Sequence, residues 1–562
     1  MDTQRLILFF VFSFSLLLLW TEWEKEQRPK PVLVTAGSVQ PGEVKAIPGA
    51  VPTPAGAVPT PTTAAPTPAA ATAVPAAATA RGEVVQVRTD LMVADIDTLG
   101  ASLVRLELLK HKETNDQTKN LVLLGPEHQY YAQSGLTGEG GPNHRTAWRA
   151  LPGDRSLAEG KNSLEVRFVA EGKDGLTVEK AYTFKRNSYI VDVALELRNA
   201  GGGPVAPHAY FQLTHDGKQP AGGSSLAQSF GAQSFNGFAE YTTVKNFEKV
   251  QYSDIDKGKV DHAKQATDGW IAFIQHYFVA AWVPAATGSR DYVIEKRPDG
   301  LYSGRVVLPV PSIAPGATAK VVAPLYAGPQ EQNRLKEVAP GFDLVVDYGW
   351  LTIIAWPLFW LLEKFHSMTG NWGVAIILLT VTIKIVFFPL SAASYKSMAK
   401  MKVITPRLTK IREMYANDRA RQNQAMMELY KTEKINPLGG CFPILVQIPV
   451  FIALYWVLLA AIELRHAPFM LWIQDLSALD PYYVLPILMT VTMIIQTKLN
   501  PVPPDPVQAK VMQIMPFVFS IFFFFFPAGL VLYWLVNNIL SITQQWQIQR
   551  MFERGKPAHG KR

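Results

Sequence analysis

The chain combines long apolar runs near its two ends with a middle section in which apolar and polar residues alternate. About twenty apolar residues in a helix span the hydrocarbon core of a bilayer. The apolar runs lie at residues 6–20, 371–390, 443–464, 482–497, 511–526 and 528–548. The pattern therefore predicts a multi-pass α-helical membrane protein with six spans, the last five of which are clustered and form its core.

Residues 81–335 show the period of two that is typical of half-buried strands. Leu164, Val166 and Phe168 alternate with polar residues, and the turn sequence GKDG precedes a second alternating run. Further strands are expected at residues 191–197, 270–273, 278–282, 292–295 and 304–309. This length fits one large all-β domain, so we expect a β-sandwich here.

Three flanking segments differ in composition. Residues 1–28 carry the first apolar run with Trp20 and Trp23 beside it, which favours an uncleaved membrane anchor over a cleaved signal peptide. Residues 29–80 are rich in Pro, Ala and Thr, which predicts an extended linker without a core. Residues 336–368 contain a connector and an aromatic-rich amphipathic helix, which we expect in the membrane interface; a kinked buried helix is the alternative.

The distribution of basic and acidic residues predicts which segments lie on which side of the membrane. From Gly341 onward there are 20 basic and 12 acidic residues, and residues 395–436 hold ten of the basic ones against four acids. By the positive-inside rule this loop and the basic tail at 550–562 are cytoplasmic, which places the N-terminus inside and the β-domain outside. We therefore expect the second span, which contains Lys384, at residues 369–394. The four further spans are expected within residues 437–549. The single cysteine, Cys441, excludes an intrachain disulfide.

Lys384 lies inside the apolar run at 371–390, where a charge costs roughly 2.5–3.5 kcal/mol. Snorkelling to the headgroups is one interpretation, and a functional site is the other. No span supplies an acid to pair with it, so we expect a wet groove rather than a buried ion pair. Interhelical hydrogen bonding is the alternative for each polar residue taken singly. The candidate groove residues are Thr380, Lys384, Gln447, Gln496, Tyr533, Trp534, Asn537 and Ser541.

The basic loop at 395–436 predicts a helical hairpin, because apolar residues recur there every three or four positions. Thr405 and Pro406 predict the N-cap and first turn of a restarted helix, and Asn417 and Asp418 predict its end. The hairpin either packs on itself or offers methionines to apolar substrates and cations to anionic lipid or RNA. The candidate recruitment residues are Met398, Met401, Lys402, Arg407, Met414 and Met426.

Three stretches resemble the YidC membrane protein insertases: NPLGGCFPILVQIPVFIALYW from Asn436, DLSALDPYYVLPILM from Asp475 and FPAGLVLYWLVNN from Phe526. The resemblance implies a bacterial inner-membrane protein with a periplasmic β-super-sandwich of galactose-mutarotase-like shape. It also implies five core helices around a hydrophilic groove whose positive residue receives substrate. The family usually has Arg at that position, whereas this chain has Lys384, which keeps the charge but loses the bidentate fork.

The resemblance implies insertion and folding of nascent membrane proteins, alone or beside the SecYEG translocon. Further implied partners are the ribosome, the signal recognition particle with its receptor, and membrane lipids. The sequence has no P-loop, and neither a catalytic constellation nor a DNA-binding signature, so we expect no enzyme activity, cofactor, metal or DNA partner. The spacing of His208, His215 and His276 supports neither a catalytic triad nor a metal site, so we interpret them as scattered surface and core histidines. The rival functions are a secondary transporter and a carbohydrate-binding membrane protein.

Overall fold

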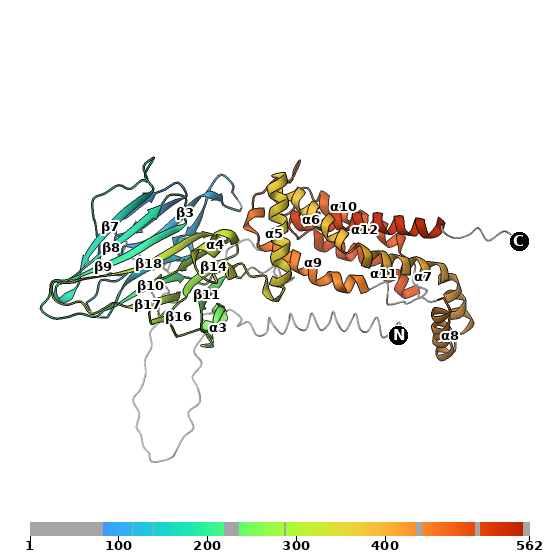
Figure 1. Cartoon of the computed structure of the whole chain (residues 1–562), viewed down its shortest axis with the longest axis horizontal. Coiled ribbons are helices and arrows are strands. Elements are labelled where there is room, and N and C mark those ends of the chain that lie inside the picture. The colour runs from blue at the N-terminus through green and yellow to red at the C-terminus, as the bar shows by residue number, and fades with distance from the viewer. Residues whose placement is uncertain are drawn as a thin grey trace, which may run out of the picture.

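The computed structural model describes residues 82–114, 116–138, 140–218, 235–285, 288–433, 442–500 and 506–554. The predicted anchor at 1–28, the predicted linker at 29–80, Cys441 and residues 555–562 of the predicted tail lie outside them. The described residues form an N-terminal β-domain followed by a helical region (Figure 1).

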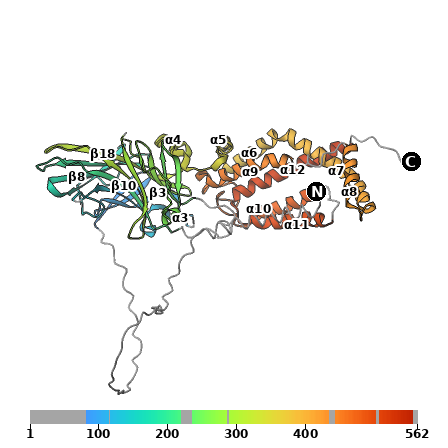
Figure 2. The same cartoon turned by 90° about the horizontal axis from the view of Figure 1, so that it is seen from below.

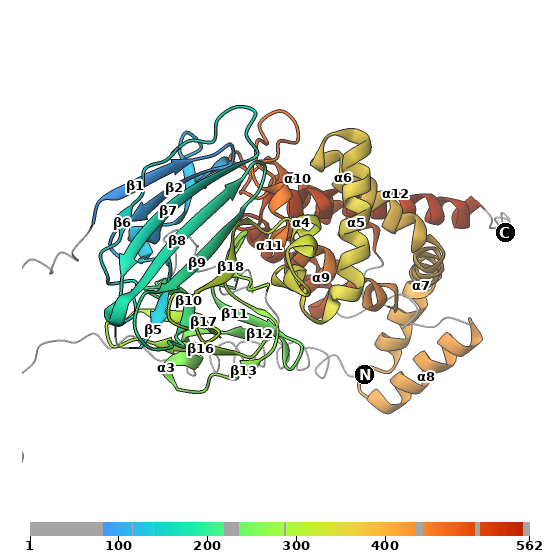
Figure 3. The ribbon, with the colours of Figure 1, turned by 60° about the vertical axis from the view of Figure 1, so that its left-hand side comes forward.

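The β-domain consists of two antiparallel nine-stranded sheets that pack face to face, which confirms the predicted sandwich (Figure 3). The first sheet has the order β1 (Val84–Arg88), β2 (Met92–Asp97), β3 (Ser102–Lys112), β5 (Tyr131–Thr137), β10 (His208–His215), β17 (Tyr302–Pro309), β16 (Arg290–Lys296) and β13 (Gln265–Ala266), with β4 (Asn120–Leu124) beside β3. The second has the order β12 (Asn246–Val250), β11 (Gly237–Thr242), β14 (Trp270–Gln275), β15 (Phe278–Trp282), β18 (Thr318–Pro329), β9 (Ile190–Asn199), β8 (Leu176–Lys185), β7 (Ser163–Glu171) and β6 (Arg149–Ala150).

The alternation seen in the sequence is the alternation of burial along these strands. Leu164, Val166 and Phe168 of β7 are buried, and the residues between them face outward. The GKDG turn joins β7 to β8, with Asp174 in the left-handed region at φ 56°. The hydrophobic face of each sheet thus forms one continuous core between the two sheets.

Lys180 departs from this pattern, because its side chain on β8 is fully buried, and this burial lowers its pKa from 10.5 to about 7. Its Nζ donates to the carbonyls of Gly100 (2.8 Å), Ser134 (2.8 Å) and Ala101 (3.3 Å), which belong to the opposite sheet and the turn before β3. It also lies 4.6 Å from the centre of the Trp148 ring. Lys180 therefore ties the two sheets together through backbone acceptors.

The helical region extends away from the β-domain, with α5 lying across the longer helices (Figures 1 and 2). Short helices α3 (Tyr252–Asp256) and α4 (Gln332–Val338) belong to the β-domain and the connector. The longer helices are α5 (Thr352–Thr369), α6 (Trp372–Val386), α7 (Phe388–Met414), α8 (Arg419–Thr432), α9 (Phe442–Ala460), α10 (Val484–Leu499), α11 (Pro506–Phe523) and α12 (Ala528–Arg554). Each predicted span from 371 onward thus contains a helix.

The predicted second span, which contains Lys384, is divided between two helices that meet at a sharp bend. α6 ends at Val386 and α7 begins at Phe388, with a bend of 67° between them. Pro389 explains the break, since proline has no N–H to continue the helix and is favoured in a first turn. By length and hydropathy, none of the described helices crosses a bilayer singly, and only the bent pair α6 and α7 meets both criteria together. The count of six spans therefore stays a prediction.

The prediction that a helix restarts at Thr405 and Pro406 is wrong, because α7 runs through Pro406 without interruption. A proline inside a helix costs about 3 kcal/mol, so tertiary contacts must offset it. Ile404 and Leu408, on either side of Pro406, are buried against α8. Packing within the hairpin therefore overrides the local start signal.

The β-domain is fixed to the helical region by polar contacts at the end of α9. Arg465 donates to the carbonyl of Lys112 (2.5 Å) and to Thr114 Oγ1 (3.1 Å). The Nε2–H of His276 donates to the carbonyl of Leu459 (3.1 Å). Burial lowers the pKa of His276 from 6.5 to about 4, so the ring is neutral in this junction at pH 7.

Acidification should loosen this junction. Since the pKa of His276 is lower when docked than when exposed, its contribution is complete above pH 6.5 and is lost as the pH falls toward 4, by roughly 1–3 kcal/mol. Hydrogen exchange of the amides near Leu459 and Lys112, measured on the full chain from pH 7 to 4.5, should show the loss. His276→Gln keeps a donor but does not titrate and should flatten the curve; identical curves for both chains would contradict the assignment.

Candidate functional site

Lys384 lies in the last turn of α6 and faces α12. Its Nζ donates to Ser541 Oγ (2.7 Å), and the Ser541 hydroxyl donates in turn to the Asn537 carbonyl (2.7 Å). Only 6% of Lys384 is exposed. The lysine is therefore held between two helices and does not reach outward along the helix surface as snorkelling would require.

Asn537 extends this arrangement to a third helix, because its Oδ1 accepts a hydrogen bond from Gln447 Nε2 on α9 (3.3 Å). We call Lys384, Gln447, Asn537 and Ser541 the polar seam. Thr380 is also buried one turn from Lys384, but its hydroxyl donates to the Ile376 carbonyl of its own helix (2.7 Å). The structure thus brings together four of the eight predicted groove residues.

No carboxylate oxygen of the described residues lies within 4.0 Å of Lys384 Nζ, and its recorded hydrogen-bond partner is the neutral Ser541. Removing an ammonium from water without an opposite charge is costly. The seam therefore favours any anion or water that reaches it.

The remaining predicted groove residues have other surroundings. Trp534 stacks on Phe451 of α9 (5.3 Å) and packs edge-on against Phe523 (4.7 Å). Tyr533 is buried 6.2 Å from the same Phe451 ring. Gln496 is half-buried on α10, and among the described residues its side chain makes no hydrogen bond to the polar seam. These three residues stay predictions as groove residues.

Sequence reasoning missed a second row of polar contacts between α12 and α10. Asn538 donates to Thr492 Oγ1 (2.9 Å), and Gln545 donates to Asn500 Oδ1 (3.0 Å). A signal was present, since the four-residue spacing from Tyr533 to Ser541 continues to Gln545. α12 therefore forms side-chain hydrogen bonds with α6, α9 and α10.

The predicted cytoplasmic hairpin forms from the C-terminal part of α7 and α8. Met401 and Met426 pack against the buried Ile404 and Leu408, as the self-packed alternative predicts. Met398 is half-buried, Lys402 is exposed, and Arg407 pairs with Glu433 (2.7 Å). Met414 is 71% exposed, and Met427, which was not predicted, is also exposed. Within the hairpin the exposed methionines are thus Met414, which belongs to the predicted recruitment set, and Met427, which does not.

His215, interpreted from the sequence as one of the scattered surface and core histidines, is a buried core residue that lies beside His128 and Asp216. The ring nitrogens of His128 and His215 each lie 3.5 Å from Asp216 Oδ1, an arrangement compatible with a metal ion. However, His215 Nδ1 already accepts the N–H of Gly217 (2.9 Å) and lies 2.9 Å from the Tyr252 hydroxyl. The nitrogen is therefore engaged in hydrogen bonds within the core.

Comparison with known proteins agrees with this architecture. The family model described as YidC periplasmic domain matches residues 84–361, and the model described as 60Kd inner membrane protein matches residues 364–555. The membrane protein insertase YidC of Aromatoleum aromaticum is 54% identical over 571 residues, covering 99% of both chains. That of Methylobacillus flagellatus is 52% identical, covering 99% of this chain and 98% of its own. A crystal structure of an active YidC insertase covers 83% of this chain and 94% of its own, with 17% identity and a TM-score of 0.38. The chain belongs to the YidC family of membrane protein insertases.

Proposed function

We propose that this insertase receives the polar extracytoplasmic segment of a nascent membrane protein at the polar seam, with Lys384 as the charge that attracts it. The observation that carries the proposal is the buried Lys384 ammonium, which is bonded to the Ser541 hydroxyl and has no carboxylate within 4.0 Å among the described residues. A substrate carboxylate would supply the missing opposite charge.

The free energy for insertion then comes from the substrate itself. An apolar helix gains about 25 cal/mol for each Å² that leaves water, which amounts to many kcal/mol for a full span. The contacts among Lys384, Gln447, Asn537 and Ser541 support a hydrophilic groove between α6, α9 and α12. The groove lowers the free-energy barrier to moving the polar segment of the substrate across the membrane, while the apolar segment passes into the lipid. This mechanism uses no nucleotide.

The orientation and the finer partners belong to the same proposal. The excess of basic residues in the hairpin and tail supports cytoplasmic termini and a periplasmic β-domain. The exposed Met414, Met427 and Lys402 support the hairpin as a contact for emerging chains, the ribosome, or the signal recognition particle and its receptor. The proposed SecYEG contact rests on the family alone.

Reconstitution tests the central proposal. Proteoliposomes that contain only this purified chain should insert a small single-span protein with an acidic extracytoplasmic tail, measured by protection of the tail from added protease. Protein-free liposomes of the same lipid are the control. Equal protection in both would refute insertion by this chain alone.

Deletions should show which of two proposed extracytoplasmic elements, the β-domain or the α5 helix, matters more for insertion. Removing most of residues 81–328 should be tolerated better than removing residues 349–367, because α5 packs directly on α6 and α9 whereas the β-domain touches mainly the end of α9. Growth of cells depleted of their own insertase and supplied with each deleted chain measures the ranking. The reverse order would place the active part in the β-domain.

A further inference from the structure

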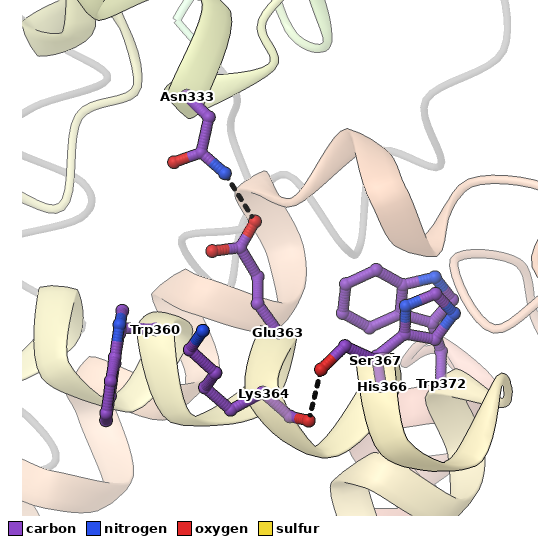
Figure 4. Close-up of a pocket in the computed structure, with 7 residues that line it drawn as sticks. All are labelled: Asn333, Trp360, Glu363, Lys364, His366, Ser367 and Trp372. Atoms are coloured by element: carbon purple, nitrogen blue, oxygen red, sulfur yellow. Dashed lines mark hydrogen bonds between the residues drawn. The ribbon is translucent and has the colours of Figure 1, made fainter.

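A cavity of about 470 Å³ lies between α4, α5 and the start of α6, away from the polar seam. Figure 4 shows Trp360 at one end, the stacked rings of His366 and Trp372 at the other, and the side chains of Glu363 and Lys364 between them. The volume falls in the range of small-ligand sites, roughly 300–1,000 Å³. The cavity thus combines two indole rings with one carboxylate and one ammonium.

Both charges in the cavity are available to a ligand. Glu363 Oε1 accepts a hydrogen bond from Asn333 Nδ2 (2.9 Å), and no ion pair of Glu363 or Lys364 occurs within 4.0 Å in the described ranges. Lys364 Nζ lies 5.9 Å from the centre of the Trp360 ring. Partial burial raises the pKa of Glu363, and a bound cation would lower it again. The two side chains therefore fit a ligand that carries both signs of charge.

The aromatic walls fit the cationic end of such a ligand. Indole faces attract ammonium groups within about 6 Å of the ring centre. His366 lies parallel to Trp372 at 4.0 Å, which fixes the orientation of that indole, and burial lowers the pKa of His366, so that it adds no competing charge at pH 7. Because Lys364 already lies over Trp360, the Glu363 carboxylate and the Trp372 ring form the site for a cation.

The surroundings of the cavity indicate where the ligand comes from. α5 carries an exposed apolar stripe of Ile353 (86% exposed), Trp356 (47%) and Trp360 (49%), which share one helical face. Lys336 lies over the Trp356 ring at 5.0 Å. Exposed tryptophans flanked by lysines are typical of a helix at the lipid headgroups. Trp360 belongs to both the stripe and the cavity, so acyl chains along the stripe would bring a headgroup into the cavity.

We propose that this cavity binds the headgroup of a phosphatidylethanolamine lipid, with the primary ammonium against Glu363 and Trp372 and the phosphate against Lys364. Phosphatidylcholine has no N–H to donate to Glu363, and phosphatidylglycerol has no cation, so both fit less well. The site is independent of the polar seam, and its test does not depend on insertion activity.

Native mass spectrometry of the detergent-solubilised full chain tests the site with short-chain phosphatidylethanolamine, phosphatidylcholine and phosphatidylglycerol as probes. The ethanolamine lipid should bind at least tenfold more tightly than the other two. Free glycerophosphoethanolamine, which has no acyl chains to lie on the stripe, should bind at least tenfold more weakly than the lipid. Equal binding of the free headgroup would overturn the membrane source, and equal binding of all three lipids would overturn the site.

Two variants and a matched control sharpen this test. Glu363→Gln should weaken binding of the ethanolamine lipid about tenfold and leave that of phosphatidylglycerol unchanged. Lys364→Gln changes an exposed side chain and should weaken both lipids. Glu337→Gln, at an exposed position on α4 outside the cavity, should change neither. Unchanged ethanolamine-lipid binding in both cavity variants, or an equal loss in Glu337→Gln, would overturn the proposal.

Discussion

Replacing Lys384 by glutamate is expected to reduce insertion of substrates with acidic extracytoplasmic tails at least tenfold. The exchange turns an attractive charge into a repulsive one at a buried position, and tenfold corresponds to only about 1.4 kcal/mol. Insertion is measured as protease-protected tail in proteoliposomes that contain equal amounts of each chain. Substrates with uncharged tails should be affected less, because they lose no charge interaction.

Two further variants separate charge from folding. Lys384→Arg should retain insertion, since guanidinium keeps the charge and donates to Ser541 as lysine does. Lys498→Glu makes the same charge change at an exposed position on α10 and should have little effect. If wild type and Lys384→Glu insert acidic-tailed substrates equally, Lys384 does not capture substrate.

The β-domain was the part of the fold most open to prediction from sequence. Strands such as β7 and β8 bury every second residue, so Leu164, Val166 and Phe168 mark both the strand and its inner face. The pairing order was not predictable, because β5 lies between β3 and β10, and β10 is more than 70 residues further along the chain. No local sequence signal specifies which distant strand will pair with β5. The buried Lys180 was missed for the same reason, since its acceptors come from the other sheet.

The helical region shows where local signals fail. Pro389 lies in the first turn of α7, after the break from α6, whereas Pro406 lies inside α7, between Ile404 and Leu408, which pack on α8. Lys384 could be identified from the sequence because a charged side chain in a long apolar run costs free energy wherever that run lies in the fold. Its partner Ser541 was among the predicted residues, but Thr380, which is nearer in sequence, bonds to its own helix instead. Helical spacing predicts which residues share a face, and only the packing of α6 on α12 decides which of them meet.

Replacing Lys180 by alanine is expected to destabilise the β-domain by about 3–5 kcal/mol, the largest effect on stability that we expect in this chain. Lys180 donates to the carbonyls of Gly100, Ala101 and Ser134 inside the sandwich, and of these the Ala101 carbonyl keeps a second donor in the Tyr182 hydroxyl (2.6 Å). A buried acceptor that loses its donor costs about 1–3 kcal/mol, and the lost side chain leaves a cavity as well. The change therefore removes both the cross-link between the sheets and part of their packing.

The matched control for this change lies on the same strand. Lys185 is exposed at the end of β8 and pairs with Asp192 (2.6 Å), so Lys185→Ala should cost less than about 1 kcal/mol. Hydrogen exchange of β3, β5 and β8 amides in the full chain measures both variants. Exchange should accelerate in all three strands of Lys180→Ala, because the acceptors lie in β5 and next to β3. Acceleration in β8 alone, or an equal effect of Lys185→Ala, would show that Lys180 does not join the two sheets.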